Sequence, residues 1–486
     1  MRRTRLIPVL GLVLALVAAS CGDPKTDNQS GRKKVTKGSL ADCPMDALRK
    51  ATSPVKVTLW YSGLSAKPLD TLKSMVQEYN ASQNKVVVQA ENQGPDYDSG
   101  LAKVKGAVKT KDLPQLTLLE NTATPAMVDS GIVFPAEACM KATNVSLDAI
   151  EPAVRAYYTV NGIYWPGYVN VAEPVLYYNK AAFVTAKLDP EKPPTNLDEL
   201  RATAEKLKAS GVAKPLALSL KRWFIESWLT GDGQSVVNAN DGRDGTPTKA
   251  NLDTPEMVKL LTFLKKMEAD GLVQAIPNTP GNIDQYLALQ GNSAMTLETS
   301  TASTSIAAFL KGDITGQDIG AGNVQVDPTK LKAGSASFPG VKLPGRVSVG
   351  GGAFFLFDPK AYNGTPAQLA ASWDFLRFMN ETKQAVRWHI EGSYLPSVKA
   401  VNEDPAVQKF ATSDVAGALL KPAREQLAQI DPNRPGPLIG PYKDYGDAVE
   451  AMFESVMLKG TDPATAAKEA QARVTDALQK YKEDNG

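Results

Sequence analysis

Apolar and polar side chains alternate from Val55 to Leu59, a pattern that predicts a half-buried strand at the start of the folded part of the chain. Apolar residues then recur at helical spacing from Leu69 to Tyr79. Strand and helix patterns continue to alternate, which predicts parallel sheet with crossover helices. Further strands are expected in the short apolar runs at 86–88, 116–119, 175–178, 294–297 and 353–357.

Two later helices are expected from their capping residues. Thr195, followed three positions later by Asp198, has near-capping-box spacing. The C-terminal helix is expected to start near Thr461 and to reach Tyr481. The helix after Thr195 has a repeating apolar face made of Leu197, Leu200, Ala204 and Leu207.

The first twenty residues have the pattern of a cleavable export signal. Three arginines precede the uncharged run 6–19, which as a helix spans about 21 Å, short of the roughly 30 Å hydrocarbon core. The run ends in small residues before Cys21, which resembles a bacterial lipobox. We therefore expect residues 1–20 to be a signal peptide and Cys21 to carry a lipid; an ordinary signal with an incidental cysteine is the alternative.

The polar segment 21–53 has too few large apolar residues to build a core, so it is interpreted as a flexible tether. Lipidation of Cys21 leaves two cysteines, Cys43 and Cys139. In an oxidising compartment these two form either a disulfide or two unrelated buried thiols. A disulfide would fix the N-terminal segment to the first folded unit.

Size and charge narrow the class of protein. About 430 residues follow Pro54, which is enough for two or more compact units, and 43% of the residues are apolar. The net charge of +2 falls to −1 when the three signal arginines are removed, so no basic surface for nucleic acid is expected. No later stretch is apolar enough to predict a membrane span.

Common catalytic and metal-binding patterns are missing from the sequence. His389 is the single histidine and lies in a helix-like stretch beside Trp388, so a structural role is expected. There is no G-x-S-x-G, and Gly350–Gly352 lacks the lysine of a phosphate-binding loop. The segment 238–245 lacks calcium-loop spacing, with Lys249 where the glutamate should be, and is interpreted as a surface turn. We expect no metal site and no cofactor.

An ordered set of motifs resembles a known family. The segments 174–180 (PVLYYNK), 188–194 (LDPEKPP), 207–211 (LKASG) and 294–296 (AMT) come first, followed by Gly351-Gly-Ala, Trp388-His and Tyr394-Leu-Pro. Their order is similar to that of extracellular solute-binding proteins of carbohydrate ABC importers, in particular the branch that binds glycerol 3-phosphate and glycerophosphodiesters. The resemblance implies an α/β, two-lobed periplasmic-binding-protein fold with a central ligand cleft and crossing hinge strands. It implies a first lobe at 54–170 plus 350–394, and a second at 171–349 plus 395–486.

The same resemblance implies a set of cleft residues. Tyr97 matches a cleft tyrosine of the first lobe, Glu120 a carboxylate that accepts hydrogen bonds from ligand hydroxyls, and Tyr394 a tyrosine at a lobe crossing. Trp223 matches a tryptophan that packs on the carbon skeleton of the ligand. Leu220 falls where some members have a second tryptophan. Either Thr299 or Ser300 matches a hydroxyl position. Gly351 and Gly352 match glycines that allow close approach of the backbone to the ligand.

Two positions depart from the branch. Its serines before the PVLYY motif are replaced by Val171-Ala-Glu173, and its phosphate-pairing arginine by Leu438. A phosphate without a cationic partner loses charge-assisted hydrogen bonds of roughly 1.5–3 kcal/mol each. Arg434 is the candidate substitute; without it, a neutral or zwitterionic ligand is favoured.

Together with the export signal before Cys21, the resemblance predicts a monomeric lipoprotein outside the cytoplasm, anchored to the cell membrane through Cys21. It would bind a sugar, polyol or glycerophosphodiester by lobe closure, deliver it to ABC permease subunits, and catalyse nothing. The alternatives are a secreted hydrolase of glycosides or phosphodiesters, which needs a carboxylate pair facing the cleft, and a ligand sensor on the same fold.

Overall fold

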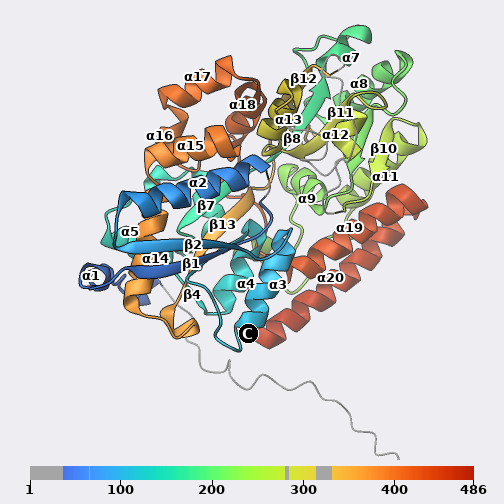
Figure 1. Ribbon diagram of the computed structural model, residues 1–486. Helices are drawn as coiled ribbons and strands as arrows, with labels where there is room; N and C mark the ends of the chain where they lie inside the picture. Colours follow the sequence, from blue (N-terminus) through green and yellow to red (C-terminus); the bar gives the residue numbers. More distant parts are fainter. Residues whose placement is uncertain (1–36, 65, 280–283, 314–330, 486) are drawn as a thin grey trace, which may run out of the picture. The chain divides into compact units, whose positions relative to one another are not determined.

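The structure is a computed structural model, in which residues 37–64, 66–279, 284–313 and 331–485 are described (Figure 1). The expected signal peptide 1–20, the lipidation site Cys21 and the tether up to residue 36 lie outside these residues. In the described part, no helix has both the length and the apolar character needed to cross a bilayer.

The first sheet has the strand order β2–β1–β3–β13–β4, with β7 also paired to β13. Strands β2 and β3 run parallel to β1, whereas β13 runs antiparallel to β3, β4 and β7. The strands are β1 (Val55–Tyr61), β2 (Val86–Asn92), β3 (Leu116–Glu120), β4 (Val133–Phe134), β7 (Tyr168–Ala172) and β13 (Gly350–Phe357).

The second sheet has the order β10–β9–β11–β8–β12. Here β9, β10 and β11 are parallel, and β8 is antiparallel to β11 and β12. The strands are β8 (Pro174–Asn179), β9 (Leu216–Ser219), β10 (Val273–Ile276), β11 (Met295–Thr299) and β12 (Ala333–Ser337), and a separate ribbon pairs β5 (Thr159–Val160) with β6 (Ile163–Tyr164).

The expectation of wholly parallel sheets is wrong for β8 and β13. Each of these strands reaches its sheet from the other sheet: β7 leads through Glu173 directly into β8, and the chain returns from β12 to β13. A strand that arrives this way has no crossover helix on its own sheet, so it is free to pair antiparallel. A third connection is a bridge in which Leu395 donates its N–H to the Val171 carbonyl at 2.8 Å.

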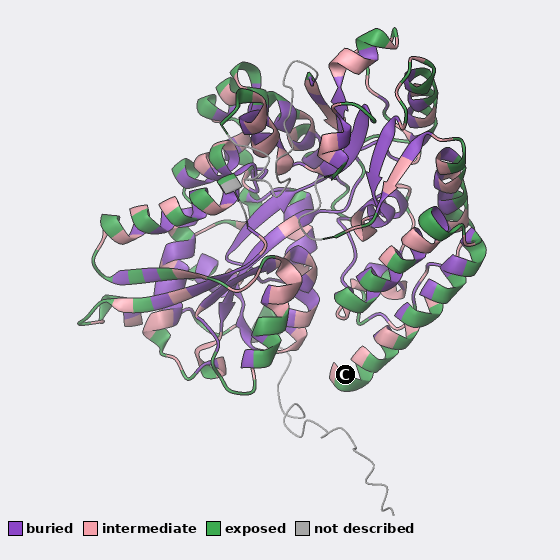
Figure 2. Cartoon of the chain, turned by 45° about the vertical axis from the view of Figure 1, so that its right-hand side comes forward, coloured by how far each residue is buried: buried purple, intermediate pink, exposed green. Residues whose placement is uncertain are grey.

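Amphipathic helices cover both sheets, while the strands are buried almost throughout (Figure 2). The first sheet is covered by helices α2, α3 and α14. The second sheet is covered by helices α9, α11, α12 and α18. Helices α19 and α20 pack on each other and on α11 (Figure 1). The main helices are α2 (Ala66–Ser82), α3 (Tyr97–Ala107), α4 (Thr124–Asp129), α5 (Ala136–Ala142), α6 (Pro152–Tyr158), α7 (Lys180–Thr185), α8 (Leu197–Ala209), α9 (Arg222–Gly231), α11 (Pro255–Ala269), α12 (Asp284–Ala288), α13 (Ala302–Lys311), α14 (Pro366–Met379), α15 (Thr382–Gly392), α16 (Lys399–Asn402), α17 (Pro405–Ser413), α18 (Val415–Leu427), α19 (Tyr442–Lys459) and α20 (Pro463–Asn485).

The two expected helix caps, Thr195 and Thr461, each lie one residue before the residue that caps the helix in the structure. Helix α8 is capped by Asn196, whose Oδ1 accepts from the Glu199 N–H at 2.9 Å, because Thr195 instead binds the Glu199 carboxylate. At the start of α20, Asp462 rather than Thr461 accepts from the N–H of Thr465. The predicted apolar face of α8 is buried as expected.

The N-terminal segment joins the folded body earlier than expected. Cys43 and Cys139 form a disulfide, with their Cα atoms 4.8 Å apart. Helix α1 (Met45–Arg49) follows, packs on α14 and buries Leu48. The predicted tether 21–53 is therefore wrong from Cys43 onward, because these residues have a covalent bond and an apolar contact with the body.

The segment 238–245 is not the simple surface turn that was expected. Residues 239–241 have left-handed backbone angles, and the Asp241 side chain is 8% exposed. Its Oδ1 accepts from the N–H groups of Val236 and Val237 at 2.7 and 3.2 Å. The Asp241 carboxylate therefore stabilises the backbone of its own loop through these two hydrogen bonds.

Candidate functional site

A cleft of about 350 Å³ is lined by residues of both sheets and of helices α3, α9 and α19. Tyr97, Glu120 and Gly351 come from the first sheet and its helix α3, and Trp223 and Thr299 from the second sheet and its helix α9. Residues that are distant in sequence therefore meet where the chain crosses between the sheets.

Local packing explains how the first sheet presents its residues. Asp96 caps α3 by accepting from the Ser99 N–H at 2.7 Å, which places Tyr97 at the first position of the helix. Glu120 ends β3 opposite Gly352 of β13. Gly351 has φ +115°, and a Cβ there would lie 1.8 Å from the Asn170 carbonyl oxygen, so only glycine fits.

Aromatic side chains form one wall of the cleft. Tyr97 and Tyr394 both line it, and the Tyr394 ring stacks on Trp388 with centroids 5.4 Å apart. The Trp388 indole in turn donates to Asn170 Oδ1 at 2.9 Å. Burial raises the pKa of Tyr97 well above its ordinary value and that of Tyr394 to about 12, so both present neutral hydroxyls.

Trp223 lines the cleft from α9. It is half-buried, and its ring packs against Gly350 of β13, where an added Cβ would lie 2.3 Å from Cζ2. The absence of a side chain at position 350 is therefore what lets the indole lie against the first sheet. The Tyr394 and Trp223 rings give the cleft apolar surfaces for a carbon skeleton.

Arg222, the neighbour of Trp223, connects the two sheets. Its guanidinium lies 3.6 Å from Glu120 Oε2 and 3.4 Å from Glu450 Oε1, and 5.3 Å from the centre of the Tyr442 ring. Burial opposes its charge, but attraction to Glu120, Tyr442 and Glu450 is stronger, so the pKa of Arg222 is raised. Gly446 of α19 leaves the necessary room, since a Cβ there would be 2.4 Å from Arg222 Cδ.

Two further carboxyl groups complete the polar lining. Glu298 binds Lys221 Nζ at 2.5 and 2.6 Å through its two oxygens. Glu226 is 3% exposed and accepts from the Tyr442 hydroxyl at 2.9 Å. Burial raises the pKa of Glu226 to about 7, despite hydrogen bonds from Tyr442 and Ser348 that lower it.

The structure brings six of the ten sequence-predicted site residues to this cleft. These are Tyr97, Glu120, Trp223, Thr299, Gly351 and Tyr394.

Three other predicted residues lie beside the cleft without lining it. Leu220 is fully buried, and its N–H donates to the Ile276 carbonyl at 2.9 Å, so its side chain belongs to the core. Ser300 is also fully buried, and its hydroxyl accepts from the Glu173 N–H at 3.2 Å. Gly352 underlies Tyr97: a Cβ there would lie 3.0 Å from the Tyr97 hydroxyl.

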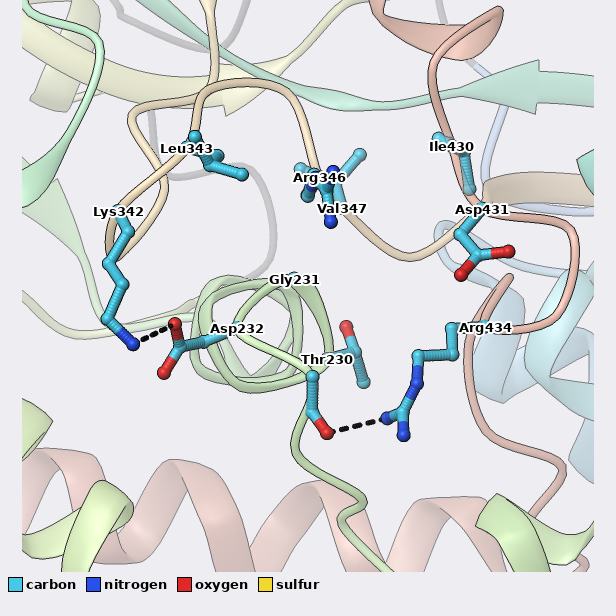
Figure 3. Close-up of a pocket in the computed structure, with 11 residues that line it drawn as sticks. Thr230, Gly231, Asp232, Lys342, Leu343, Arg346, Val347, Ile430, Asp431 and Arg434 are labelled. Atoms are coloured by element: carbon cyan, nitrogen blue, oxygen red, sulfur yellow. Dashed lines mark hydrogen bonds and ion pairs between the residues drawn. The ribbon is translucent and has the colours of Figure 1, made fainter.

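Arg434, the expected substitute for the phosphate-pairing arginine, lines a different pocket (Figure 3). Its Nη1 donates to the Gly233 carbonyl at 2.6 Å, and Arg346 and Lys342 line the same pocket. Leu438 is buried and does not line the cleft. The hypothesis that Arg434 supplies the cleft with a cation is therefore wrong, because its side chain turns toward the C-terminal end of α9.

Of the charged residues that line the cleft, only Glu120 was predicted from the sequence. Lys221 and Arg222 directly precede Trp223, and Glu226 follows one helical turn after Arg222. On α19, Tyr442, Gly446 and Glu450 recur every four residues, which is one face of a helix. That spacing is a usable signal, but only the fold shows that this face meets α9.

His389 has the structural role that was expected. It is 2% exposed, and its Nδ1 lies 2.9 Å from the Tyr394 carbonyl oxygen. The described residues contain no group of three or more histidine, cysteine or carboxylate side chains placed to hold a metal.

Residues 74–413 match the family of bacterial extracellular solute-binding proteins. The chain belongs to this family. Among its relatives, the sn-glycerol-3-phosphate-binding periplasmic protein UgpB of Escherichia coli O6:K15:H31 is 25% identical over 445 residues, which cover 89% of this chain and 95% of that protein. The corresponding protein of Escherichia coli K12 is 26% identical over 370 residues, or 74% of this chain and 78% of that protein.

Solved structures share the fold. The sugar-binding protein MalE of Xanthomonas citri aligns with a TM-score of 0.70 and 18% identity, covering 88% of this chain and 98% of that one. UgpB of Mycobacterium tuberculosis, solved with glycerophosphocholine, aligns with a TM-score of 0.68 and 17% identity, covering 89% and 100%. The predicted two-lobed α/β fold is thereby confirmed, and so is the predicted class of solute-binding protein.

The family and these relatives are binding proteins rather than enzymes. As an extracellular solute-binding protein, the chain acts outside the cytoplasm.

Proposed function

We propose that this solute-binding protein captures a small hydroxylated solute (a sugar, a polyol or a glycerophosphodiester) between its two sheets and delivers it to the permease of an ABC importer. The observation that carries the proposal is the cleft itself. Its aromatic walls, Tyr394 and Trp223, come from opposite sides, and polar side chains such as Glu120 and Thr299 lie at their edges. The E. coli and M. tuberculosis relatives named above bind glycerol 3-phosphate and glycerophosphocholine, which are solutes of this size and polarity.

The architecture supports capture by closure. We place the two lobes at residues 54–170 with 350–394, and at 171–349 with 395–486. Among the described residues, the chain crosses between the two sheets near Glu173 and through residues 338–349, and a bridge pairs Val171 with Leu395. A hinge at these connections moves Trp223 and Arg222 relative to Tyr97 and Glu120. Binding without catalysis, a monomeric state and anchoring through a lipid on Cys21 belong to the same proposal.

Isothermal titration calorimetry tests the proposal directly. The folded protein is titrated with monosaccharides, disaccharides, glycerol, glycerophosphodiesters and glycerol 3-phosphate. We expect saturable one-to-one binding of at least one of these solutes. Failure of a folded sample to bind any of these solutes would contradict the proposed function.

Gly350 offers a steric test of the binding position. Because its Cβ would lie 2.3 Å from the Trp223 ring, the Gly350→Ala variant is expected to displace the indole and weaken binding of the tightest solute by about ten-fold, roughly 1.4 kcal/mol. Gly106→Ala is the matched control: it lies on the outer part of α3, and its Cβ meets nothing within 4 Å. Equal affinity of the two variants, measured by calorimetry, would rule out the Trp223–Gly350 contact as part of the site.

A further inference from the structure

The cleft has an unbalanced set of charges. Among the described residues that line it, the cations are Lys221 and Arg222, and the carboxyl groups are Glu120, Glu226, Glu298 and Glu450. The balance of this set determines which charged groups of a solute the cleft is able to accept.

Both cations are already engaged by the protein. Lys221 is held by both oxygens of Glu298, whose side chain is only 4% exposed. Arg222 is 16% exposed and lies between Glu120 and Glu450. A phosphate monoester would have to compete with these carboxylates for a partly buried cation, and would lie close to their negative charge.

Glu120 is the carboxylate left available to a solute. Its side chain is 32% exposed, against 18% for Glu450 and 4% for Glu298. Its Oε2 accepts from the Thr122 hydroxyl at 2.7 Å and faces Arg222, while its Oε1 makes no hydrogen bond to the described residues. One oxygen of this cleft-lining carboxylate therefore has no hydrogen-bond partner among the described residues.

The cleft that Glu120 lines also contains several aromatic side chains. Tyr97, Trp223, Tyr394 and Tyr442 all line the same cleft. The negative faces of such rings attract cations, and they also pack against the C–H surface of a hydroxylated carbon skeleton. Carboxylate and aromatic groups together form a site that stabilises a positive charge on the solute.

From this arrangement we infer that the natural solute is a hydroxylated molecule bearing a protonated primary amine, such as an amino sugar or amino polyol, with its ammonium group on Glu120 and its carbon skeleton against Trp223. This rests on the proposed function. A primary ammonium group has three N–H donors, which suit Glu120 Oε1 and the neighbouring Thr122 hydroxyl. A quaternary ammonium group has no donor and leaves Glu120 Oε1 without a hydrogen bond.

Calorimetry with matched pairs tests the inference. Each pair differs only by an amine in place of a hydroxyl: glucosamine and glucose, galactosamine and galactose, 2-aminopropane-1,3-diol and glycerol. At pH 6, where the amines are protonated, the amine of the pair that binds is expected to bind at least about ten-fold more tightly. N-acetylglucosamine, glycerophosphocholine and glycerol 3-phosphate are titrated alongside.

The variant Glu120→Gln keeps the shape of the side chain and removes its charge. It is expected to weaken binding of the amine more than binding of the hydroxyl partner, and so to reduce the preference for the amine to less than about three-fold. Asp232→Asn is the matched control, because it removes the same charge from a carboxylate outside the cleft, and it is expected to keep the preference.

The outcomes separate the inference from the proposed function. Equal or tighter binding of the hydroxyl member, or tightest binding of glycerophosphocholine or glycerol 3-phosphate, overturns the primary-amine inference while the proposed function stands. An amine preference that survives in Glu120→Gln also overturns it, because the ammonium group then lies elsewhere. Absence of binding by every solute overturns the proposed function and this inference with it.

Discussion

Replacing Trp223 with alanine is expected to weaken solute binding by about ten- to one-hundred-fold. The indole is half-buried in the free protein, lies against Gly350 and lines the cleft opposite Tyr394. Burying one aromatic face against a solute is worth roughly 1–3 kcal/mol, and each 1.4 kcal/mol corresponds to about ten-fold in affinity. The dissociation constants of the wild type and of the variant are compared by calorimetry.

Trp228 provides the matched control on the same helix. It is fully buried, and its Nε1 donates to the Pro339 carbonyl at 2.9 Å, outside the cleft. Trp228→Phe is therefore expected to lower thermal stability while leaving affinity nearly unchanged, whereas Trp223→Ala is expected to do the reverse. If both variants bind like the wild type, Trp223 does not contact the solute.

The second large effect concerns stability in acid. Burial lowers the pKa of His389 from its ordinary value of 6.5 to about 4. The hydrogen bond to the Tyr394 carbonyl acts in the other direction. Since a carbonyl oxygen only accepts, Nδ1 carries the proton of the neutral ring. The folded protein therefore binds this proton less readily than the unfolded chain does.

The sign of the pH effect follows from this difference in pKa. The stability contributed by neutral His389 is fully present above about pH 6.5 and is lost as the pH falls toward 4. The difference between the ordinary pKa of 6.5 and the pKa of about 4 in the folded protein corresponds to about 3 kcal/mol of stability. Glu226 acts oppositely, because its raised pKa of about 7 makes the folded state gain stability as the pH falls.

The His389→Gln variant isolates the histidine, which is the only one in the sequence. Glutamine keeps an N–H donor near the Tyr394 carbonyl but does not titrate. The variant is expected to be less stable than the wild type at pH 7.5, with the difference shrinking by about 3 kcal/mol at pH 4. Urea unfolding at both pH values measures it; a difference that stays constant with pH would show that His389 is not buried in its neutral form.

Much of the fold was predictable because its signals are local. The alternation at Val55–Leu59 and the helical face of α8 reflect burial on one side of a single element. The short strand β7 was missed because it is buried on both faces and includes Asn170, which breaks the apolar run while binding Trp388 inside the core. The antiparallel direction of β8 and β13 depends on where the chain crosses between sheets, which no local pattern reveals.

The predicted site residues also fall into two groups, those that lie in the cleft and those that do not. The resemblance brought Tyr97, Glu120, Trp223 and Tyr394 to one cleft, but it also suggested Leu220 and Arg434, which point elsewhere. Leu220 lies one residue after β9, where its backbone is still bonded to Ile276, and so its side chain stays in the core.

Arg222 is the clearest case of a residue beyond the reach of sequence reasoning. Its partners Glu120 and Glu450 lie on a strand of the other sheet and on a helix near the C-terminus. Nothing in the residues around position 222 indicates that its charge is already balanced, yet this is the observation that argues against a phosphate ligand.

A crystal structure of the protein with the tightest-binding solute tests the central claim most directly. We predict density for the solute between Trp223 and Tyr394, with a polar group within hydrogen-bond distance of Glu120. Density in the pocket of Arg434 and Arg346, with the cleft between the two sheets left without solute, would contradict the account.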